Sequence, residues 1–461
     1  MKSFLLNTYY KLLGSLARRY IRKKKPYIIG INGSVWKTSC RMIVTQTLQQ
    51  LLPHVPVYTS PKNFNGELWM SLSIFEIEKY TPSVFGMVSV LFTAVKKLRI
   101  TNYKWQKVLV LEYGIDHPGE MQFLISIAKP HISIHTQIDS VHSQQFGDAH
   151  AIAKEEFLLQ QNTRNIVFLN QEDPYISHVT GTIPCDTITY SATGETEWTI
   201  IQIDTNISLE WEHGVIWHTA QKAKVTFNNR KSLSLSINIL GRYHLSYAAV
   251  GACIGEIISY AFFKKPAFED DAHISLALSL QPWRWSLFDG IYDSIIVDST
   301  YNASPRSVKQ IIEEVSQWRD HKHGTRKLLF VLWDMRELWT QEEKEHIKLA
   351  MFLQWYDATL FMVWKVMWSI VEPYFERNWP GRLQQILHFP HYQEAATYLQ
   401  TYLSEHQHEK FIILCKWSQN TIFLEEVVAS ILANVKDKGK LTRQGTWWEG
   451  KKWEFLNSVK K

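Results

Sequence analysis

Short apolar runs alternate with amphipathic segments over most of the first half of the chain. Residues 26–33 (PYIIGING) predict a buried strand that ends in glycine, and residues 37–52 have the periodicity of a helix. The alternation continues with apolar runs at 107–114, 131–138 and 165–170 and with a helical segment at 148–161. Buried strands that alternate with helices are typical of a mostly parallel α/β sheet. We therefore expect the strand, loop and helix near residue 30 to belong to such a sheet.

The pattern changes near residue 195 and starts again near residue 280. Residues 195–240 alternate apolar and polar positions, which predicts antiparallel hairpins, and residues 244–263 form a helical pattern rich in small residues. After residue 280, apolar runs again alternate with helical segments, which predicts a second, doubly wound, Rossmann-like domain. The expected organisation is a helix over 1–25, a central α/β domain over 26–280 and a C-terminal α/β domain over 281–461.

The first 25 residues predict an amphipathic helix with a strongly basic end. Its apolar positions have helical spacing and lie at Leu5, Tyr9, Leu12, Leu16 and Tyr20. The cations that follow are Arg18, Arg19, Arg22, Lys23, Lys24 and Lys25. Two interpretations stay open: a helix packed on the first domain with a solvated basic end, or a helix lying on an anionic membrane face.

The sequence shows neither the pattern of a signal peptide nor that of a spanning helix. The cations come after the apolar part of this first segment, whereas a signal peptide has them before it. The chain has no stretch of 18 apolar residues, so we expect no spanning helix. We therefore expect a cytoplasmic protein whose only membrane contact would be peripheral, through the N-terminal helix.

Composition places the chain among globular proteins and excludes several classes. Of its 461 residues, 45% are hydrophobic and 20% are charged, which is enough for a large core and excludes disorder. The formal net charge of +6 suits phosphate-bearing ligands or an anionic surface but does not demand nucleic acid. The four cysteines lie far apart and form no CxxC pair, so they predict neither a disulfide framework nor a zinc site and fit a reducing compartment.

Residues 30–39 (GINGSVWKTS) have nearly the layout of a nucleotide phosphate loop. In such a loop, glycines let backbone N–H groups turn toward phosphate, a lysine meets the β- and γ-phosphates, and a Ser or Thr hydroxyl binds Mg²⁺. Here Gly33, Lys37 and Thr38 stand in that arrangement, but the residue before the lysine is Trp36 instead of glycine. Alone, this loop is a weak indication of nucleotide binding.

Further motifs, in the same order, make the indication specific, and with them the chain resembles the Mur ligase family. The resemblance runs from about residue 26 to residue 430 and covers both predicted α/β domains. Its segments are GINGSVWKTS at 30–39, NFNGELW at 63–69, EYGIDHPGE at 112–120, TQIDSVH at 136–142 followed by Phe146, Gly147 and Lys154, PWRW at 282–285, VDSTYNASPRS at 297–307, LWDMRELW at 332–339 and KWSQN at 416–420.

The resemblance implies an ATP-dependent, ADP-forming ligase that joins a carboxylate to an amine through an acyl phosphate. The central domain would then be a P-loop-type ATPase domain. ATP and Mg²⁺ are the implied cofactors. The implied substrates are a muropeptide precursor of peptidoglycan, UDP-linked or other, and D-Ala-D-Ala. Little covalent work falls to such a protein, which positions the groups and neutralises charge. Because the motifs lie in two domains, we expect domain closure that excludes water before the chemistry. We expect a monomer that does not bind nucleic acid.

The resemblance also assigns roles residue by residue. Catalytic positions are matched by Lys37, Glu112, His142 and Lys154, the last at the place of a lysine that is carbamylated in relatives. Metal ligands are matched by Thr38, Glu112 and His142. The nucleotide would be held by Asn32, Gly33, Ser34, Val35, Trp36, Lys37, Thr38, Arg284, Asp298, Tyr301 and Asn302. Lys416 and Ser418 match a motif near the incoming amino substrate.

Tryptophan stands at several positions where the family pattern has glycine. These positions are Trp36, Trp69, Trp283, Trp333, Trp339 and Trp417, with Trp364 as a seventh candidate. The chain has 20 Gly and 19 Trp, whereas average usage would give about 32 glycines in this length. We hypothesise that the gene reads UGA as glycine and that UGA is translated as tryptophan in this sequence. The alternative is a degenerate site, since an indole beside the loop backbone obstructs phosphate and adopts positive φ poorly.

Two departures from the family pattern concern the substrate. The phosphate loop begins near residue 30, so we expect the separate N-terminal domain that holds the uridine nucleotide in typical ligases to be missing. Tyr243 and Tyr247 stand where the family segment has His and Asn, and Gln137 replaces an Asn. The alternatives are therefore a Mur-family ligase acting on another acidic or lipid-linked substrate and, if Trp36 is genuine, a scaffold that is inactive toward ATP.

Overall fold

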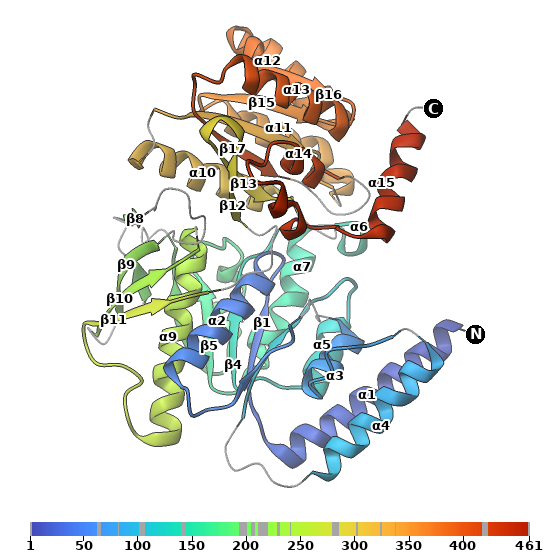
Figure 1. The fold of residues 1–461 in the computed structure, drawn as a ribbon. Helices are drawn as coiled ribbons and strands as arrows, with labels where there is room; N and C mark the ends of the chain where they lie inside the picture. The colour runs from blue at the N-terminus through green and yellow to red at the C-terminus, as the bar shows by residue number, and fades with distance from the viewer. Residues whose placement is uncertain are drawn as a thin grey trace.

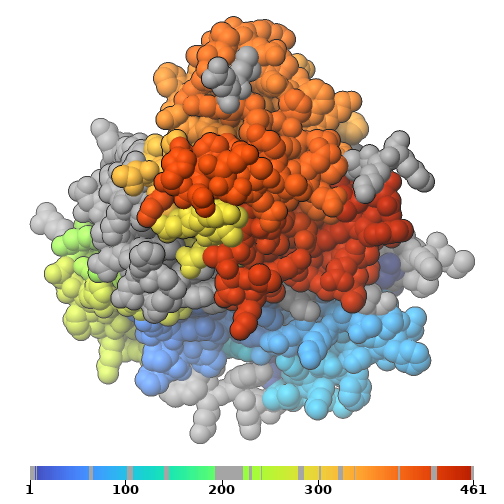
Figure 2. All heavy atoms as spheres, turned by 45° about the horizontal axis from the view of Figure 1, so that its top comes forward, coloured from blue at the N-terminus to red at the C-terminus, as the bar shows by residue number. Residues whose placement is uncertain are grey.

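The structure is a computed structural model of the 461-residue chain. It describes residues 2–61, 66–81, 83–100, 107–139, 143–192, 201–203, 208–210, 220–227, 231–239, 241–278, 285–300, 303–322, 325–336, 338–416 and 423–459. Within these ranges the strands form two separate sheets, one built from the first 276 residues and one from residue 286 onward. Figure 1 shows the second α/β unit lying above the first, and Figure 2 shows the surface of the molecule with the top of Figure 1 tilted toward the viewer.

The first unit contains the predicted strand, loop and helix near residue 30. Its helices are α1 (Lys2–Lys24), α2 (Lys37–Leu51), α3 (Glu67–Ile74), α4 (Val84–Arg99), α5 (Glu120–Ile127), α6 (Ser143–Phe146), α7 (Ala149–Glu156), α8 (Leu158–Gln161) and α9 (Arg242–Phe263). Its strands are β1 (Tyr27–Asn32), β2 (Val57–Tyr58), β3 (Val108–Glu112), β4 (Ile132–His135), β5 (Ile166–Asn170), β6 (Asp186–Tyr190), β7 (Ile201–Ile203), β8 (Ser208–Glu210), β9 (Ala220–Phe227), β10 (Ser232–Ile237) and β11 (Ala272–Leu276).

The first sheet is parallel at one end and largely antiparallel at the other. Its strand order is β11-β10-β9-β7-β6-β5-β4-β1-β3-β2, and the run from β6 to β2 is parallel throughout. The antiparallel pairs of β9 with β7, β8 and β10 confirm the hairpins expected at 195–240. β11 then joins β10 in parallel, which the sequence pattern did not predict.

Alternate residues of β1 face opposite sides of the sheet, and helices cover both sides. Ile29 and Ile31 pack in one core with residues of α2 and α9, whereas Ile28 packs in another core with residues of α1, α3 and α5. A strand covered on both faces is expected to be apolar throughout. The carboxyl ends of β4, β1 and β3 lie side by side, because Asn32 pairs with His135 and Ile31 pairs with Glu112.

The second unit is a doubly wound sheet. Its strands are β12 (Ser286–Gly290), β13 (Ser294–Ser299), β14 (Lys327–Trp333), β15 (Ala358–Val363), β16 (Ile386–Phe389) and β17 (Phe411–Lys416). Its helices are α10 (Pro305–Lys322), α11 (Glu342–Leu353), α12 (Glu372–Asn378), α13 (Tyr392–Glu405), α14 (Glu425–Ser430) and α15 (Thr446–Val459). The order β12-β13-β17-β14-β15-β16 is parallel except for β12.

Alternating residues of β14 again separate two cores. Leu328, Phe330 and Leu332 face the core shared with α10 and α11, and Leu329 and Val331 face the core shared with α13 and α14. The fold class expected from the sequence is therefore confirmed in both units. The division at residue 280 stays a prediction, and the chain passes from β11 to β12 around it.

The structure bears on two expectations about membrane segments. α1 buries Tyr9, Leu13, Ala17 and Tyr20 against the first unit, so its main apolar face is already occupied and it packs as a domain helix. α9 is long and apolar enough to cross a membrane, although no spanning helix was expected, but 67% of its most apolar window is buried inside the protein. Burial of that degree is typical of a core helix in a layered fold.

Candidate functional site

The phosphate-loop sequence lies between the carboxyl end of β1 and the first turn of α2, at the edge of the sheet where ligands of such folds bind. Gly33 has φ of 129°, and a Cβ there would approach Thr136 Oγ1 to 2.2 Å and the backbone N of Gln137 to 2.9 Å. Only glycine fits this position, since both the backbone angle and the space exclude a side chain.

The backbone carbonyl of Gln137, just after β4, holds the loop. The N–H groups of Ser34 and Val35 donate to the carbonyl of Gln137 at 2.7 and 3.3 Å. The Lys37 ammonium turns back onto the carbonyls of Gly33 and Ser34. Three donors that a phosphate would need, the N–H groups of Ser34 and Val35 and the Lys37 ammonium, are therefore turned toward protein oxygens. Binding of a nucleotide phosphate would require them to leave these partners.

Trp36, the last residue of the loop, packs against α9 and the second unit. It precedes α2 with φ of 67° and ψ of −2°, which is left-handed backbone. Its ring stacks on Tyr243, with 6.4 Å between the ring centroids and planes 6° apart, and meets Trp285 edge-on. Its Nε1 donates to Oε1 of Gln310 at 2.7 Å. The indole thus fills the space between the loop, α9 and the second unit.

Thr38 and Glu112 come together beside the loop. Thr38 Oγ1 donates to Glu112 Oε1 at 3.1 Å, and both side chains are buried. The other carboxylate oxygen of Glu112 pairs with Arg41 Nε at 3.0 Å. A hydroxyl and a carboxylate are the hard oxygen donors that Mg²⁺ prefers, so this pair fits the metal role assigned by resemblance. Arg41 was missed from the sequence, although it lies one helical turn after Lys37.

A buried carboxylate lies under the loop and was also missed. Glu156, at the end of α7, accepts from Asn32 Nδ2 at 2.8 Å and from the N–H of Gly33 at 3.1 Å. Burial raises the pKa of Glu156 above its usual range, although the Lys37 ammonium and these hydrogen bonds favour the charged form. Gln160 completes the support of Asn32 with a bond of 2.8 Å. Asn32 therefore acts in this structure as a brace for the loop.

The other candidate site residues make none of the loop contacts given above or lie outside the described residues. Lys154 lies on α7 with its side chain exposed. Asp298, at the end of β13, is buried and accepts from the N–H and hydroxyl of Thr300, and burial raises its pKa to about 6. Lys416, in the neighbouring strand β17, donates to Ser299 Oγ at 3.1 Å. The positions outside the described ranges are His142, Arg284, Tyr301, Asn302 and Ser418.

The two units meet directly over the loop. Gln310 on α10 accepts the hydrogen bond from the Trp36 indole, and its Nε2 donates to Oε1 of Gln137 at 2.8 Å. Gln137 is the residue whose carbonyl holds the loop. Nearby, the N–H of Arg306 donates to Asp139 Oδ2 at 3.1 Å, and the N–H of Arg242 donates to Glu314 Oε1 at 2.9 Å. Residues far apart in the sequence therefore share one site between the units, as domain closure would require.

Several tryptophans share the unusual backbone of Trp36. Thirteen of the 19 tryptophans are described, and four of them have positive φ: Trp36 at 67°, Trp285 at 62°, Trp339 at 48° and Trp364 at 83°. Positive φ occurs in only a few per cent of non-glycine residues. Trp69 in α3 and Trp333 in β14 have ordinary backbone, and Trp283 and Trp417 lie outside the described residues.

Trp285 was not among the positions that the family pattern marks as glycine. It is 4% exposed, and its Nε1 is buried with no hydrogen-bond partner in the described part of the chain. Left-handed backbone and an unpaired buried N–H are each costly for a large side chain. The backbone signal that identifies it was not visible from sequence spacing.

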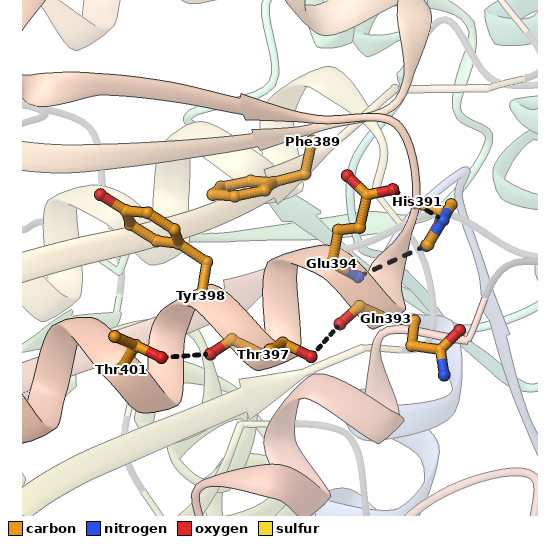
Figure 3. A pocket seen from close by; sticks show the side chains of 7 residues that line it. All are labelled: Phe389, His391, Gln393, Glu394, Thr397, Tyr398 and Thr401. Carbon is orange, nitrogen blue, oxygen red and sulfur yellow. Dashed lines mark hydrogen bonds and ion pairs between the residues drawn. The ribbon is translucent and has the colours of Figure 1, made fainter.

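A surface hollow of about 580 Å³ lies elsewhere, against α13 and the edge strand β16. Figure 3 shows Phe389 and Tyr398 on one side and His391, Gln393 and Glu394 at the start of the helix. The hollow is at the edge of the second sheet opposite to β12 and is separate from the loop.

Among the residues that the structure describes, no three His, Cys, Asp or Glu side chains are grouped as a metal site.

Comparison with known proteins agrees with this geometry. The Mur ligase middle domain family matches residues 31–255, which include the loop, Glu112 and α7. Residues 31–255 thus form a Mur ligase middle domain, which confirms the resemblance found in the sequence for this part of the chain.

Relatives within the family are distant. The UDP-N-acetylmuramoyl-tripeptide–D-alanyl-D-alanine ligases of Bacillus subtilis and Mycobacterium leprae are each 24% identical, over 72% and 73% of this chain. The chain spans less than two thirds of the length of these curated relatives, 62% and 60%.

Solved structures of MurF have the same fold. MurF from Acinetobacter baumannii superposes with a TM-score of 0.67 at 17% identity, over 91% of this chain and 80% of that one. The MurF ligase of Thermotoga maritima, determined in complex with ADP, superposes with a TM-score of 0.66 at 18% identity, over 93% and 84%.

Proposed function

We propose that this protein, with glycine at position 36, is an ATP-dependent carboxylate–amine ligase of peptidoglycan precursor synthesis in the cytoplasm. It would add D-alanyl-D-alanine to a muramoyl-tripeptide through an acyl phosphate. The observation that carries the proposal is the Thr38–Glu112 hydrogen bond of 3.1 Å, which places a hydroxyl and a carboxylate beside a phosphate-loop sequence. The relatives named as D-alanyl-D-alanine ligases support the choice of amine substrate.

The residues present divide the work between binding and orientation. Thr38 and Glu112 would hold Mg²⁺, which neutralises phosphate charge when bound. Arg41 fixes the Glu112 carboxylate in place through the ion pair at 3.0 Å. Lys37 would leave the carbonyls of Gly33 and Ser34 and turn to the transferred phosphate. Lys154, His142 and the second-domain residues Arg284, Asp298, Tyr301 and Asn302 keep the roles that the resemblance assigns.

Glycine at position 36 is part of the proposal. A residue without a side chain takes left-handed backbone without strain and leaves room between the loop and α9. The positive φ values of Trp36, Trp285, Trp339 and Trp364 support glycine at all four positions. We infer that the gene uses UGA for glycine there, so the natural protein has an open loop.

The test is an ADP-release assay on a version of the full chain with glycine at the positions that the family motif or the backbone marks. We expect ADP release to require both UDP-muramoyl-tripeptide and D-Ala-D-Ala. The Glu112→Gln variant should lose at least about a hundredfold in rate, as expected when charge stabilisation is removed. Turnover with a lipid-linked or folate-like acid instead would favour a relative with another substrate. No ATP binding by the glycine version would leave the scaffold interpretation.

A further inference from the structure

Helix α4 is apolar on two opposite faces, of which only one is packed. Its inner face, with Val90 and Ala94, is buried in the core that α1 shares. Its outer face carries a stripe at helical spacing whose members are exposed to solvent: Phe85 at 89%, Val88 at 59%, Phe92 at 72% and Val95 at 38%. A helix that is apolar on all sides is normally covered on all sides. The outer stripe, Phe85, Val88, Phe92 and Val95, is therefore a surface that needs a partner.

α1 and α4 run parallel, so their basic ends lie together. The Tyr9 hydroxyl donates to the carbonyl of Met87 near the start of the pair, and Lys23 Nζ donates to the carbonyl of Leu98 near its end, at 3.2 and 2.9 Å. Figure 1 shows the two helices side by side at the edge of the first unit, away from the second. The last turns hold Arg22, Lys23 and Lys24 on α1 and Lys96, Lys97 and Arg99 on α4.

The charge of this helix pair has one sign. The two helices contain ten Lys and Arg residues and no Asp or Glu. At 100° per residue, Arg99 falls on the same side of α4 as Phe92 and Val95, and Lys96 falls next to it. The stripe thus ends in cations on its own face. An exposed apolar stripe bordered by basic residues has the chemistry of a surface that inserts shallowly between anionic lipids.

We propose that the α1–α4 pair docks the protein on an anionic membrane surface, with the outer stripe of α4 entering the headgroup region. α1 supplies cations and holds α4, while α4 supplies the apolar contact. A second copy of the chain is a poorer occupant, because it would bring the same cations and no acidic residue from these helices. The proposal does not depend on ATP use or on the tryptophans, since neither helix contains one.

The experiment is vesicle flotation of the full chain without nucleotide. We expect binding to vesicles of phosphatidylcholine with phosphatidylglycerol, little binding to phosphatidylcholine alone, and release by salt as surface charges are screened. The Phe85→Ser/Phe92→Ser variant should bind about tenfold or more weakly, because apolar burial supplies much of such affinity. Lys96→Gln/Arg99→Gln should weaken binding to the anionic vesicles only. The matched control is Trp355→Ser, which removes an aromatic ring that is 79% exposed on the other unit.

Three outcomes would overturn the proposal. One is the absence of binding to anionic vesicles by a folded chain, with folding checked by circular dichroism. Another is unchanged binding of the Phe85→Ser/Phe92→Ser variant. The third is a dimer in analytical ultracentrifugation that this variant dissociates while neither protein floats, which would assign the stripe to a second copy. ADP release is measured separately, so failure here leaves the ligase proposal unaffected.

Discussion

The indole nitrogen of Trp36 donates a 2.7 Å hydrogen bond to Oε1 of Gln310, which lies 274 residues further along the chain. Gln310 in turn donates to Gln137, whose carbonyl accepts from the N–H groups of Ser34 and Val35. The loop, the indole and the second unit are therefore joined in one hydrogen-bonded group. The Trp36 side chain thereby ties the phosphate loop to the second unit.

Trp36→Gly is expected to create nucleotide binding. The tryptophan form should bind ATP·Mg²⁺ weakly or not at all, and the glycine form should bind at least about tenfold more tightly, a gain of about 1.4 kcal/mol. The reason is that glycine removes the ring from the loop and permits left-handed backbone without strain. Isothermal titration calorimetry measures the difference.

The control for that titration is Trp355→Gly, which removes an exposed indole just after α11 in the second unit and leaves Trp36 in place. Its ATP affinity should equal that of the tryptophan form. If the unmodified chain already binds ATP with micromolar affinity, the closed-loop interpretation is wrong and the tryptophans are compatible with function.

Trp339→Gly is expected to raise stability although it removes a large side chain. Trp339 is 64% exposed and has φ of 48°, so glycine relieves a left-handed residue at little cost in packing. The expected gain is about 1 kcal/mol, a rise in Tm of about 2 °C for a chain of this size. Differential scanning fluorimetry at fixed pH measures it.

Trp355→Gly is the matched comparison for stability, because Trp355 is 79% exposed and is not among the residues with positive φ. Glycine there only increases the conformational entropy of the unfolded chain, so the free energy of unfolding should fall by about 0.5–1 kcal/mol. Equal loss of Tm in both variants would show that Trp339 is not strained.

Thr38→Ala should raise the Mg²⁺ concentration needed for ADP release by the glycine version. Alanine removes the hydroxyl that lies 3.1 Å from Glu112 Oε1, and with it one hard oxygen donor. Thr38→Ser keeps the hydroxyl and should keep the Mg²⁺ dependence of the parent. The half-saturating Mg²⁺ concentration, measured at saturating ATP, distinguishes the two. An unchanged value in Thr38→Ala would remove Thr38 from the metal site.

Stability should fall as pH rises from 4.5 to 7 because of Glu314. This side chain accepts from the N–H of Arg242 across the two units, and burial raises its pKa from 4.5 to about 7. The folded state therefore holds a proton that the unfolded state has already released, so the contribution is complete below pH 4.5 and is lost as pH rises through 7.

Glu314→Gln keeps the hydrogen-bond acceptor and cannot ionise, so the Tm of this variant should fall less as pH rises. By pH 8, its free energy of unfolding should have fallen by roughly 1–3 kcal/mol less than that of the parent. The exposed Glu343→Gln variant on α11 is the control and should follow the parent. Parallel curves of Tm against pH for Glu314→Gln and the parent would contradict the assignment.

The codons give the most direct test of the glycine proposal. Positions 36, 69, 283, 333, 339, 364 and 417, which the family pattern marks, and position 285, which its backbone marks, should be UGA. Mass spectrometry of the native protein should find glycine at these positions. A tryptophan codon UGG at Trp36, with tryptophan in the native peptide, would make the closed loop the natural state and move the scaffold function to first place.

The sequence alone determined the alternation of strands and helices, the phosphate-loop position and the two α/β units. These features depend on local periodicity and on spacing within one short segment, which survive without knowledge of neighbours. The spacing of Lys37 and Thr38 after β1 is of this kind. The family glycines also made the tryptophans visible as an anomaly before any backbone angle was known.

Tertiary structure decided what lies against those segments. Glu156 supports Gly33 from 123 residues away, and Arg41 holds Glu112 across two elements. Trp285 joined the anomalous tryptophans only through its φ of 62°. α4 was not predicted as a helix, and its outer stripe could be separated from its inner face only when α1 was seen to cover one of them. Such features depend on which distant segments pack together, and that choice is made by the burial of the whole chain rather than by any local pattern.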